Sequence, residues 1–120
     1  MVKRDIRDYL NDILIHIDLA QRFVKGITFE EFEDDDKTIL ALTRALEIIG
    51  EATKQIPLAT RKQYPKVIWK DIAGMRDKIA HVYFGINLET VWSTTHEDLP
   101  KLRPVIQAIL NDLQASEEPP

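Results

Sequence analysis

Four side chains with useful chemistry lie close together between residues 76 and 83. Arg76, Asp77, His81 and Tyr83 bring a guanidinium, a carboxylate, an imidazole and a phenol into one short stretch. An imidazole can take the proton from a ribose 2′-hydroxyl or return one to a leaving oxygen. A guanidinium can bind a phosphate while negative charge builds on its oxygens. Arg76 and His81 are therefore the parts that RNA transesterification needs, although an Arg-x-x-x-x-His spacing by itself arises often by chance.

The apolar residues around these side chains predict that all four lie on one helix. Ile72, Met75, Ile79 and Val82 recur at three- and four-residue steps, which is helical spacing. Gly85 follows the last of them, where a helix commonly ends in a left-handed turn. The motif histidine would then lie near carbonyl groups that have no intrahelical partner, which favours the protonated imidazole.

This helix places the functional groups on different sides. Asp77 and His81, four residues apart, are neighbours, so the carboxylate can accept from the ring, orient it and favour its protonated form. Arg76 and Tyr83 lie nearly in line, whereas Arg76 and His81 diverge by roughly 140°. One copy cannot easily close both on a small substrate, but two copies across a symmetric dimer could line a shared groove.

Each of these residues also has an ordinary structural interpretation. His81 could cap a helix end, and Tyr83 could be a half-buried core aromatic. Arg76 could form a structural ion pair with Glu47 or Glu51, which are one turn apart on an earlier predicted helix. Those two glutamates could position the arginine or could keep their helix face solvated.

Metal-dependent and cofactor-dependent chemistry is not predicted. The chain has no cysteine and three scattered histidines, His16, His81 and His96, so no spacing of zinc ligands is present. Glycine-rich phosphate loops and a nucleophile turn around serine are also missing from the sequence. We therefore expect a mechanism without metal or resident cofactor, and His16 and His96 carry no functional signal.

Charge is distributed unevenly along the chain, whose net charge is −4. Residues 29–36 carry six acids and no base, whereas residues 61–78 carry six bases against two acids. The bases are Arg61, Lys62, Lys66, Lys70, Arg76 and Lys78. A basic segment around the arginine suits a phosphate-bearing substrate, although charge runs are most often solvated faces.

The elements that must position these groups are all predicted to be helices. Helical spacing marks residues 3–25, a helix that ends at Pro57, and a C-terminal helix from about residue 88 that Pro100 and Pro104 kink or restart. Thr28 begins a capping box, residues 58–64 could form a short basic helix, and Asn87 is a candidate N-cap. With no alternating strand pattern, we expect an all-α, up-and-down bundle of four or five helices in one domain.

The sequence offers no candidate membrane span. No apolar run of the 120 residues approaches the ~20 that a bilayer requires, and no charged-then-apolar leader opens the chain. We expect a cytoplasmic protein that does not bind membranes.

Several segments together closely resemble the HepT family, the HEPN-domain toxins of type II toxin–antitoxin pairs. These segments are Leu46-Glu47-Ile48-Ile49-Gly50-Glu51-Ala52, Trp69 to Tyr83 with Ile72-Ala73-Gly74-Met75-Arg76, Phe84-Gly85, Leu88-Glu89 and Val91-Trp92. The similarity runs from about Asp5 to Leu113. It implies one HEPN-like domain over residues 1–116, and from the sequence itself we expect residues 117–120 to form a disordered tail.

The resemblance also implies an activity and partners. Family members are homodimers whose paired motifs form a cleft with metal-independent endoribonuclease activity on RNA such as tRNA or mRNA. Arg76 and His81 match the catalytic pair. Asp77 matches a polar position that is usually asparagine, so its charge could weaken RNA binding or raise the pKa of the histidine. The family's partner, a minimal nucleotidyltransferase antitoxin, uses ATP to transfer AMP onto the tyrosine that matches Tyr83.

Two other functions remain open at this point. The chain could be the non-catalytic nucleotide- or substrate-binding subunit of a two-chain nucleotidyltransferase, an interpretation that Asp77 keeps open. It could also be a purely structural helical adaptor, in which Arg76 contributes only to stability.

Overall fold

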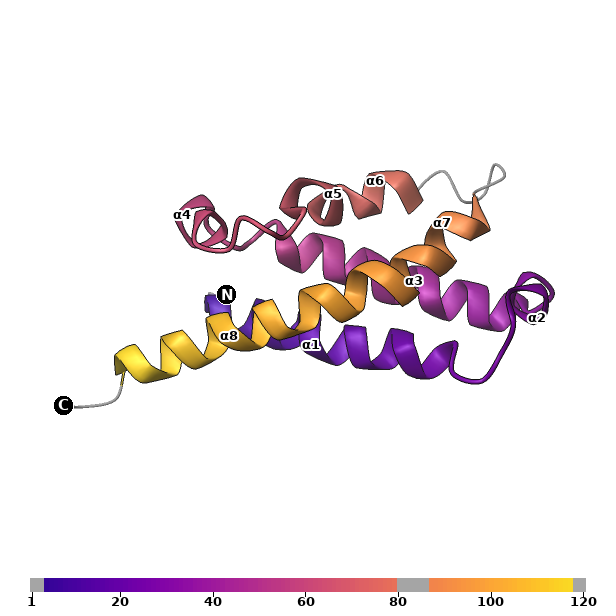
Figure 1. Cartoon of the computed structure of the whole chain (residues 1–120), viewed down its shortest axis with the longest axis horizontal. Helices are drawn as coiled ribbons and strands as arrows, with labels where there is room; N and C mark the ends of the chain where they lie inside the picture. The colour runs from indigo at the N-terminus through magenta and orange to yellow at the C-terminus, as the bar shows by residue number, and fades with distance from the viewer. Residues whose placement is uncertain (1–3, 80–86, 118–120) are drawn as a thin grey trace.

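Helices make up all the regular structure in the computed structural model, which describes residues 4–79 and 87–117 (Figure 1). They are α1 (Ile6–Phe23), α2 (Phe29–Glu33), α3 (Asp36–Thr53), α4 (Leu58–Lys62), α5 (Trp69–Ala73), α6 (Met75–Ile79), α7 (Leu88–Ser93), the π-helical turn η2 (Thr94–Asp98) and α8 (Leu99–Glu117). These residues contain no strand, so the predicted all-α class is confirmed. Because of the short helices, the described residues contain more helices than the four or five expected.

The core lies where α1, α3 and α8 pack together. α1 packs against both α3 and α8, and α3 also carries α5 and α6 on another side (Figure 1). The buried side chains recur at three- and four-residue steps: Leu10, Ile13, Ile17 and Ala20 on α1, Leu42, Leu46 and Ile49 on α3, and Leu102, Ile106 and Ile109 on α8. The three- and four-residue spacing therefore identified the packed faces correctly.

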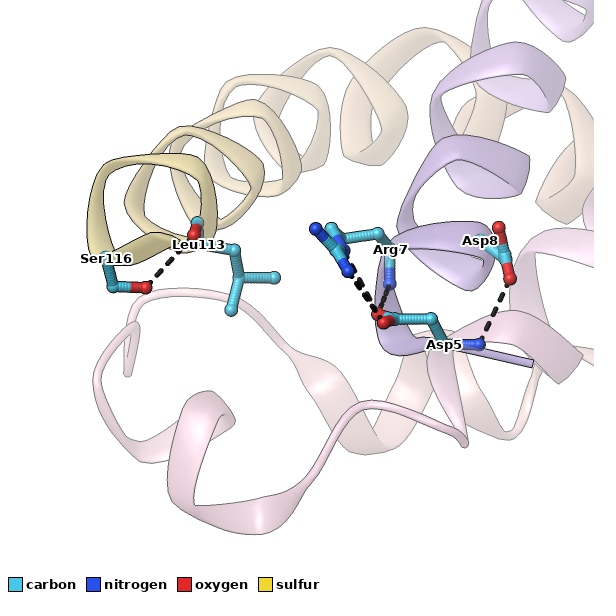
Figure 2. A network of polar contacts seen from close by, with 5 residues as sticks. All are labelled: Asp5, Arg7, Asp8, Leu113 and Ser116. Atoms are coloured by element: carbon cyan, nitrogen blue, oxygen red, sulfur yellow. Dashed lines mark hydrogen bonds and ion pairs between the residues drawn. The ribbon is translucent and has the colours of Figure 1, made fainter. Parts of the chain in front are cut away.

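α1 begins and ends with local signals. The Asp5 carboxylate accepts from the backbone N–H of Arg7 at 2.9 Å, and Asp8 Oδ2 accepts from the backbone N–H of Asp5 at 3.0 Å (Figure 2). Hydrogen bonds from Arg7 lower the pKa of Asp5 to about 2. Gly26 follows the helix with φ of +79°, a conformation that glycine adopts without steric cost. The helix is slightly shorter than the predicted 3–25.

α8 ends with a weaker signal. The Ser116 hydroxyl donates to the Leu113 carbonyl at 3.0 Å within the last turn (Figure 2). The helix includes Glu117, where the sequence placed the start of the tail.

The predicted capping box at Thr28 is confirmed and begins α2. Thr28 Oγ1 accepts from the Glu31 N–H at 3.1 Å, and the Glu31 carboxylate accepts from the Thr28 N–H at 2.9 Å. The helix is held by Phe32, which is fully buried and lies 5.2 Å from the ring of Trp92. α2 thus closes the end of the bundle where α1 turns into α3 (Figure 1).

The single helix predicted around the motif is wrong in its first half. α5 ends at Ala73, Gly74 forms a turn, and α6 begins at Met75. Gly74 has φ −82° and ψ 1°, outside the helical region, and glycine loses more entropy in a helix interior than other residues. Ile72 and Met75 remain buried on the two sides of the break, so the apolar spacing was preserved although the helix was not. The predicted end at Gly85 falls outside the described residues.

The predicted break at Pro100 and Pro104 takes a different form. α7, η2 and α8 follow one another without a non-helical residue from Leu88 to Glu117, and Pro104 lies inside α8. The irregularity is η2, where the Leu99 N–H donates to Thr94 O five residues back. Proline has no N–H to donate to the preceding turn, so a widened turn before Pro100 replaces the expected restart.

Candidate active site

α6 positions the first two residues of the motif. It carries Arg76 and Asp77 and is anchored by Met75 and Ile79, which are 7% and 4% exposed. Asp77 is exposed to solvent, and its backbone N–H donates to Gly74 O at 3.1 Å. The turn at Gly74 therefore fixes the start of the helix and leaves the Asp77 carboxylate in water.

His81 and Tyr83 lie outside the described residues. The predicted pairing of Arg76 with His81 and the predicted contact of Asp77 with His81 therefore both remain predictions.

α3 supplies the surface on which α6 rests. α6 packs against α3, and Glu47 and Glu51 are both half-buried on that helix. Glu47 Oε2 pairs with Arg44 NH1 at 3.3 Å, so one of the two candidate partners of Arg76 has an ion pair within its own helix. Such an exposed i, i+3 pair is worth only a few tenths of a kcal/mol, so it is too weak to fix the glutamate in place.

Glu51 lines a polar hollow between α3 and the start of α1. The hollow measures about 370 Å³ and is also lined by Arg4, Tyr9, Asp12 and Lys54. Arg4 NH2 pairs with Asp12 Oδ2 at 2.8 Å, and the Arg4 guanidinium lies 4.5 Å from the centre of the Tyr9 ring. Glu51 thus lies in a region of mixed charge at the hollow between α3 and α1.

A tryptophan ties α5 to the segment before it. The Trp69 indole N–H donates to Arg61 O at 3.1 Å and to Tyr64 O at 3.0 Å. Trp69 is 7% exposed, so it is a packing residue of the core. Further along, the Tyr64 hydroxyl donates to Asp112 Oδ2 of α8 at 2.5 Å, which raises the pKa of Tyr64. These bonds fix the segment that carries α5 and α6.

The basic segment is only partly available to a ligand. The Arg61 guanidinium donates to Thr53 O at 2.8 Å and to Ile56 O at 3.0 Å. It adds a side-chain donor to carbonyls at and just beyond the end of α3. Lys62, Lys66 and Lys70 are exposed and remain in solvent. Of the bases in this segment, Arg61 therefore has a structural role.

The acidic run has an equally structural role. Asp35 accepts from the Thr38 N–H at 3.1 Å and from the Thr38 hydroxyl at 2.6 Å, as the N-cap of α3. These hydrogen bonds lower the pKa of Asp35. Two acids of the run, Glu31 and Asp35, therefore stabilise the starts of helices. The capping-box spacing predicted Glu31, whereas nothing in the sequence singled out Asp35 from its acidic neighbours.

Sequence reasoning missed a second hollow, which lies between the chain before α5 and the start of α8. It is lined from both sides by Lys66, Val67, Ile68, Ile72, Asp98, Lys101, Leu102 and Val105. These residues are about thirty positions apart in the chain, so no local motif could have indicated it.

Two kinds of feature are not found in the described residues. No group of three or more His, Cys, Asp or Glu side chains there could hold a metal ion. Among those same residues, no helix combines the length and apolar character needed to cross a bilayer.

Comparison with known proteins gives one consistent match. The family model described as "Ribonuclease HepT-like" matches residues 13–109, a range that includes α3 and the whole motif. No solved structure matches the chain.

Individual relatives are similar over nearly their full lengths. A Thermococcus cleftensis protein named "Probable ribonuclease HepT" is 46% identical over 85% of this chain and 93% of its own. A Methanocaldococcus jannaschii protein named a "Putative RNase" is 41% identical over 98% of both chains. One from Caldanaerobacter subterraneus with the same description is 45% identical over 87% of this chain and 93% of its own.

Proposed function

Because the chain belongs to the HepT-like ribonuclease family, we propose that it is a metal-independent endoribonuclease that cleaves RNA by transesterification. The observation that carries the proposal is the family match over residues 13–109, which spans the motif and the helix that supports it. The relatives named as ribonucleases are similar over most of this chain.

In this proposal, each motif side chain has a definite role. His81 takes the proton from the 2′-hydroxyl, the oxygen attacks phosphorus, and the bond to the 5′-oxygen of the next nucleotide breaks as a protonated imidazole returns a proton to that oxygen. Arg76 binds the non-bridging oxygens as their charge increases. Asp77 orients the imidazole and keeps its pKa high, at the cost of a negative charge near the phosphate.

The reaction requires two copies of the chain. On one straight helix Arg76 and His81 diverge, so we propose a symmetric homodimer in which the two motifs line a shared cleft. Glu47 and Glu51, half-buried on α3 beside the motif helix, hold the arginine in place. Support comes from the anchoring of α6 through one face, which leaves Asp77 on its exposed side.

The proposed biological role is that of a toxin controlled by a nucleotidyltransferase antitoxin. The antitoxin transfers AMP from ATP to the Tyr83 hydroxyl, which forms the new phosphodiester bond and releases pyrophosphate. The added nucleotide places bulk and negative charge in the cleft, so it repels RNA by the electrostatic rules that govern phosphorylation.

A cleavage assay with matched histidine variants tests the nuclease. Wild-type protein with EDTA should cut single-stranded RNA, and His81→Ala should lower the rate by about 10²–10⁴-fold, the usual contribution of a general acid or base. His16→Ala is the control, because the His16 ring bonds only its own helix at Asp12 O in the described structure. It should cleave like wild type.

Two other results would contradict parts of this proposal. Wild-type protein that leaves RNA intact but binds nucleotide would favour the non-catalytic subunit of a two-chain nucleotidyltransferase. Intact-mass analysis after incubation with the antitoxin and ATP should show added AMP in wild type and none in Tyr83→Phe. Equal labelling of both would contradict the assignment of the modified tyrosine.

A further inference from the structure

The hollow between the chain before α5 and the start of α8 has the size and lining of a ligand site. Its volume is about 460 Å³, within the range of small-molecule pockets. Val67, Ile68 and Ile72 form one wall, and Leu102 and Val105 form the other. Ile68 is 50% exposed, so this groove presents apolar surface to solvent.

Charged side chains lie at the groove in a specific combination. Lys66 comes from the α5 side and Lys101 from α8, and both are exposed. Asp98, half-buried, lines the same groove. Among the side chains that the structure describes, none gives these three residues an ion pair or a side-chain hydrogen bond. Their charges are therefore available to an incoming ligand.

We propose that this groove binds one nucleotide of the single-stranded RNA substrate, away from the scissile bond. Apolar walls can sandwich a base, and the two lysines can contact the phosphates on either side of it. The Asp98 carboxylate can accept from an exocyclic amino group, as acidic residues do from cytosine. The groove is thus a substrate-binding subsite of the nuclease proposed above, and the inference rests on that function.

The charge of the groove favours RNA over an acidic peptide, and its size suits a base. A volume of about 460 Å³ is enough for a single base. Asp98 would also repel the carboxylates of an acidic peptide, but it complements a base that carries an amino group. The groove is next to the motif along the chain, because Ile72 belongs to α5 and Gly74 alone separates α5 from α6.

Binding can be measured independently of cleavage. The experiment uses full-length His81→Ala protein and fluorescently labelled single-stranded oligonucleotides, with the dissociation constant determined by anisotropy at several salt concentrations. Lys66→Gln with Lys101→Gln should weaken binding about tenfold, and the slope of log Kd against log salt should become shallower by about 1.4, the value for two lost phosphate contacts on a single strand.

The control replaces two exposed lysines that do not line the groove. Lys25→Gln with Lys37→Gln changes the net charge equally, and both side chains are exposed and outside the groove. This variant should retain the parent affinity and salt slope. Ile68→Ala should weaken binding without changing the slope, because it removes a base contact and no charge.

Base preference provides a second, sharper test. The parent should bind oligo(C) about tenfold more tightly than oligo(U), since only cytosine offers an amino group to Asp98. Asp98→Asn should reduce this ratio, because the amide can both donate and accept.

The possible failures can be told apart. If the groove variants bind RNA with the parent's affinity and slope while wild type still cleaves RNA, the groove proposal is wrong and the nuclease stands. If wild type never cleaves RNA, the nuclease proposal fails, whatever the binding data show. Variants that lose the antitoxin but keep RNA would identify the groove as a protein-binding surface and overturn the subsite.

Discussion

The α1–α3–α8 core and the α4–α6 arm (residues 58–79) are stabilised by different interactions. The core consists of long helices joined by fully buried aliphatic side chains such as Ile13, Leu46 and Ile106. The arm consists of five-residue helices, and α4 has no buried residue. α5 and α6 bury Trp69, Ile72, Met75 and Ile79, and a few directed hydrogen bonds from Arg61, Tyr64 and Trp69 hold the segment before them. The part of the chain that carries the motif is therefore the part with the smaller apolar anchor.

Removing a core side chain should produce the largest effect. Leu46 is 1% exposed on α3, and Leu46→Ala should lower the free energy of unfolding by ~2–5 kcal/mol through lost burial and a cavity. Urea denaturation measures this change. A loss below about 1 kcal/mol would mean that the core relaxes around the site and that α3 is less central than its burial indicates.

A change in the arm should be smaller and local. Trp69→Phe removes the indole N–H from Arg61 O and Tyr64 O, which should cost about 1–2 kcal/mol. Amide hydrogen exchange should become faster in α4 and α5 and stay unchanged in α1.

Trp92→Phe is the matched control for this prediction. It keeps a ring against Phe29 and Phe32, to which Trp92 is joined by ring contacts, and should leave exchange in the arm as it is. Equal acceleration in α1 and in the arm with Trp69→Phe would show that core and arm unfold together, and the distinction between them would fail.

The smallest effect is expected at the surface link between α1 and α8. Arg103 donates to both oxygens of Asp18 at 2.8 and 3.0 Å, but the two side chains are 40% and 49% exposed. Asp18→Asn should therefore cost less than about 1 kcal/mol at neutral pH.

This contribution should disappear in acid. The hydrogen bonds from Arg103 lower the pKa of Asp18 below its ordinary value of 3.8, so the stabilisation is present above that value and is lost as pH falls through the lowered pKa. Urea denaturation of wild type and Asp18→Asn from pH 7 to pH 2 should give converging stabilities. A difference that persists at the lowest pH would mean that the substitution acts through packing.

The same contrast explains what could be predicted from sequence. Buried residues on a helix face recur every three or four positions, so the faces containing Leu10, Leu46 and Ile106 can be recognised in the sequence. The capping box at Thr28 was visible because both partners lie within four residues.

The arm was harder to predict because its interactions join separate segments. Tyr64 bonds Asp112, which is 48 residues away, and no local pattern records such a pair. The break at Gly74 was missed because Ile72, Met75 and Ile79 keep helical spacing across it. At the motif, the sequence predicted which residues matter, and the structure places Arg76 and Asp77 on α6, while the role of each remains a proposal.

The widened turn η2 determines which side chains of α8 face the core. Val91, Thr95 and Leu99 are buried at successive four-residue intervals, a spacing that drifts around a regular helix of 3.6 residues per turn but stays aligned where a turn holds more residues. Deleting a single position from residues 94–98 would rotate the following segment by about 100°. Ile106 and Ile109 would then face water, and Lys101 would leave the groove. The length of that one turn thus sets the orientation of the whole C-terminal rod.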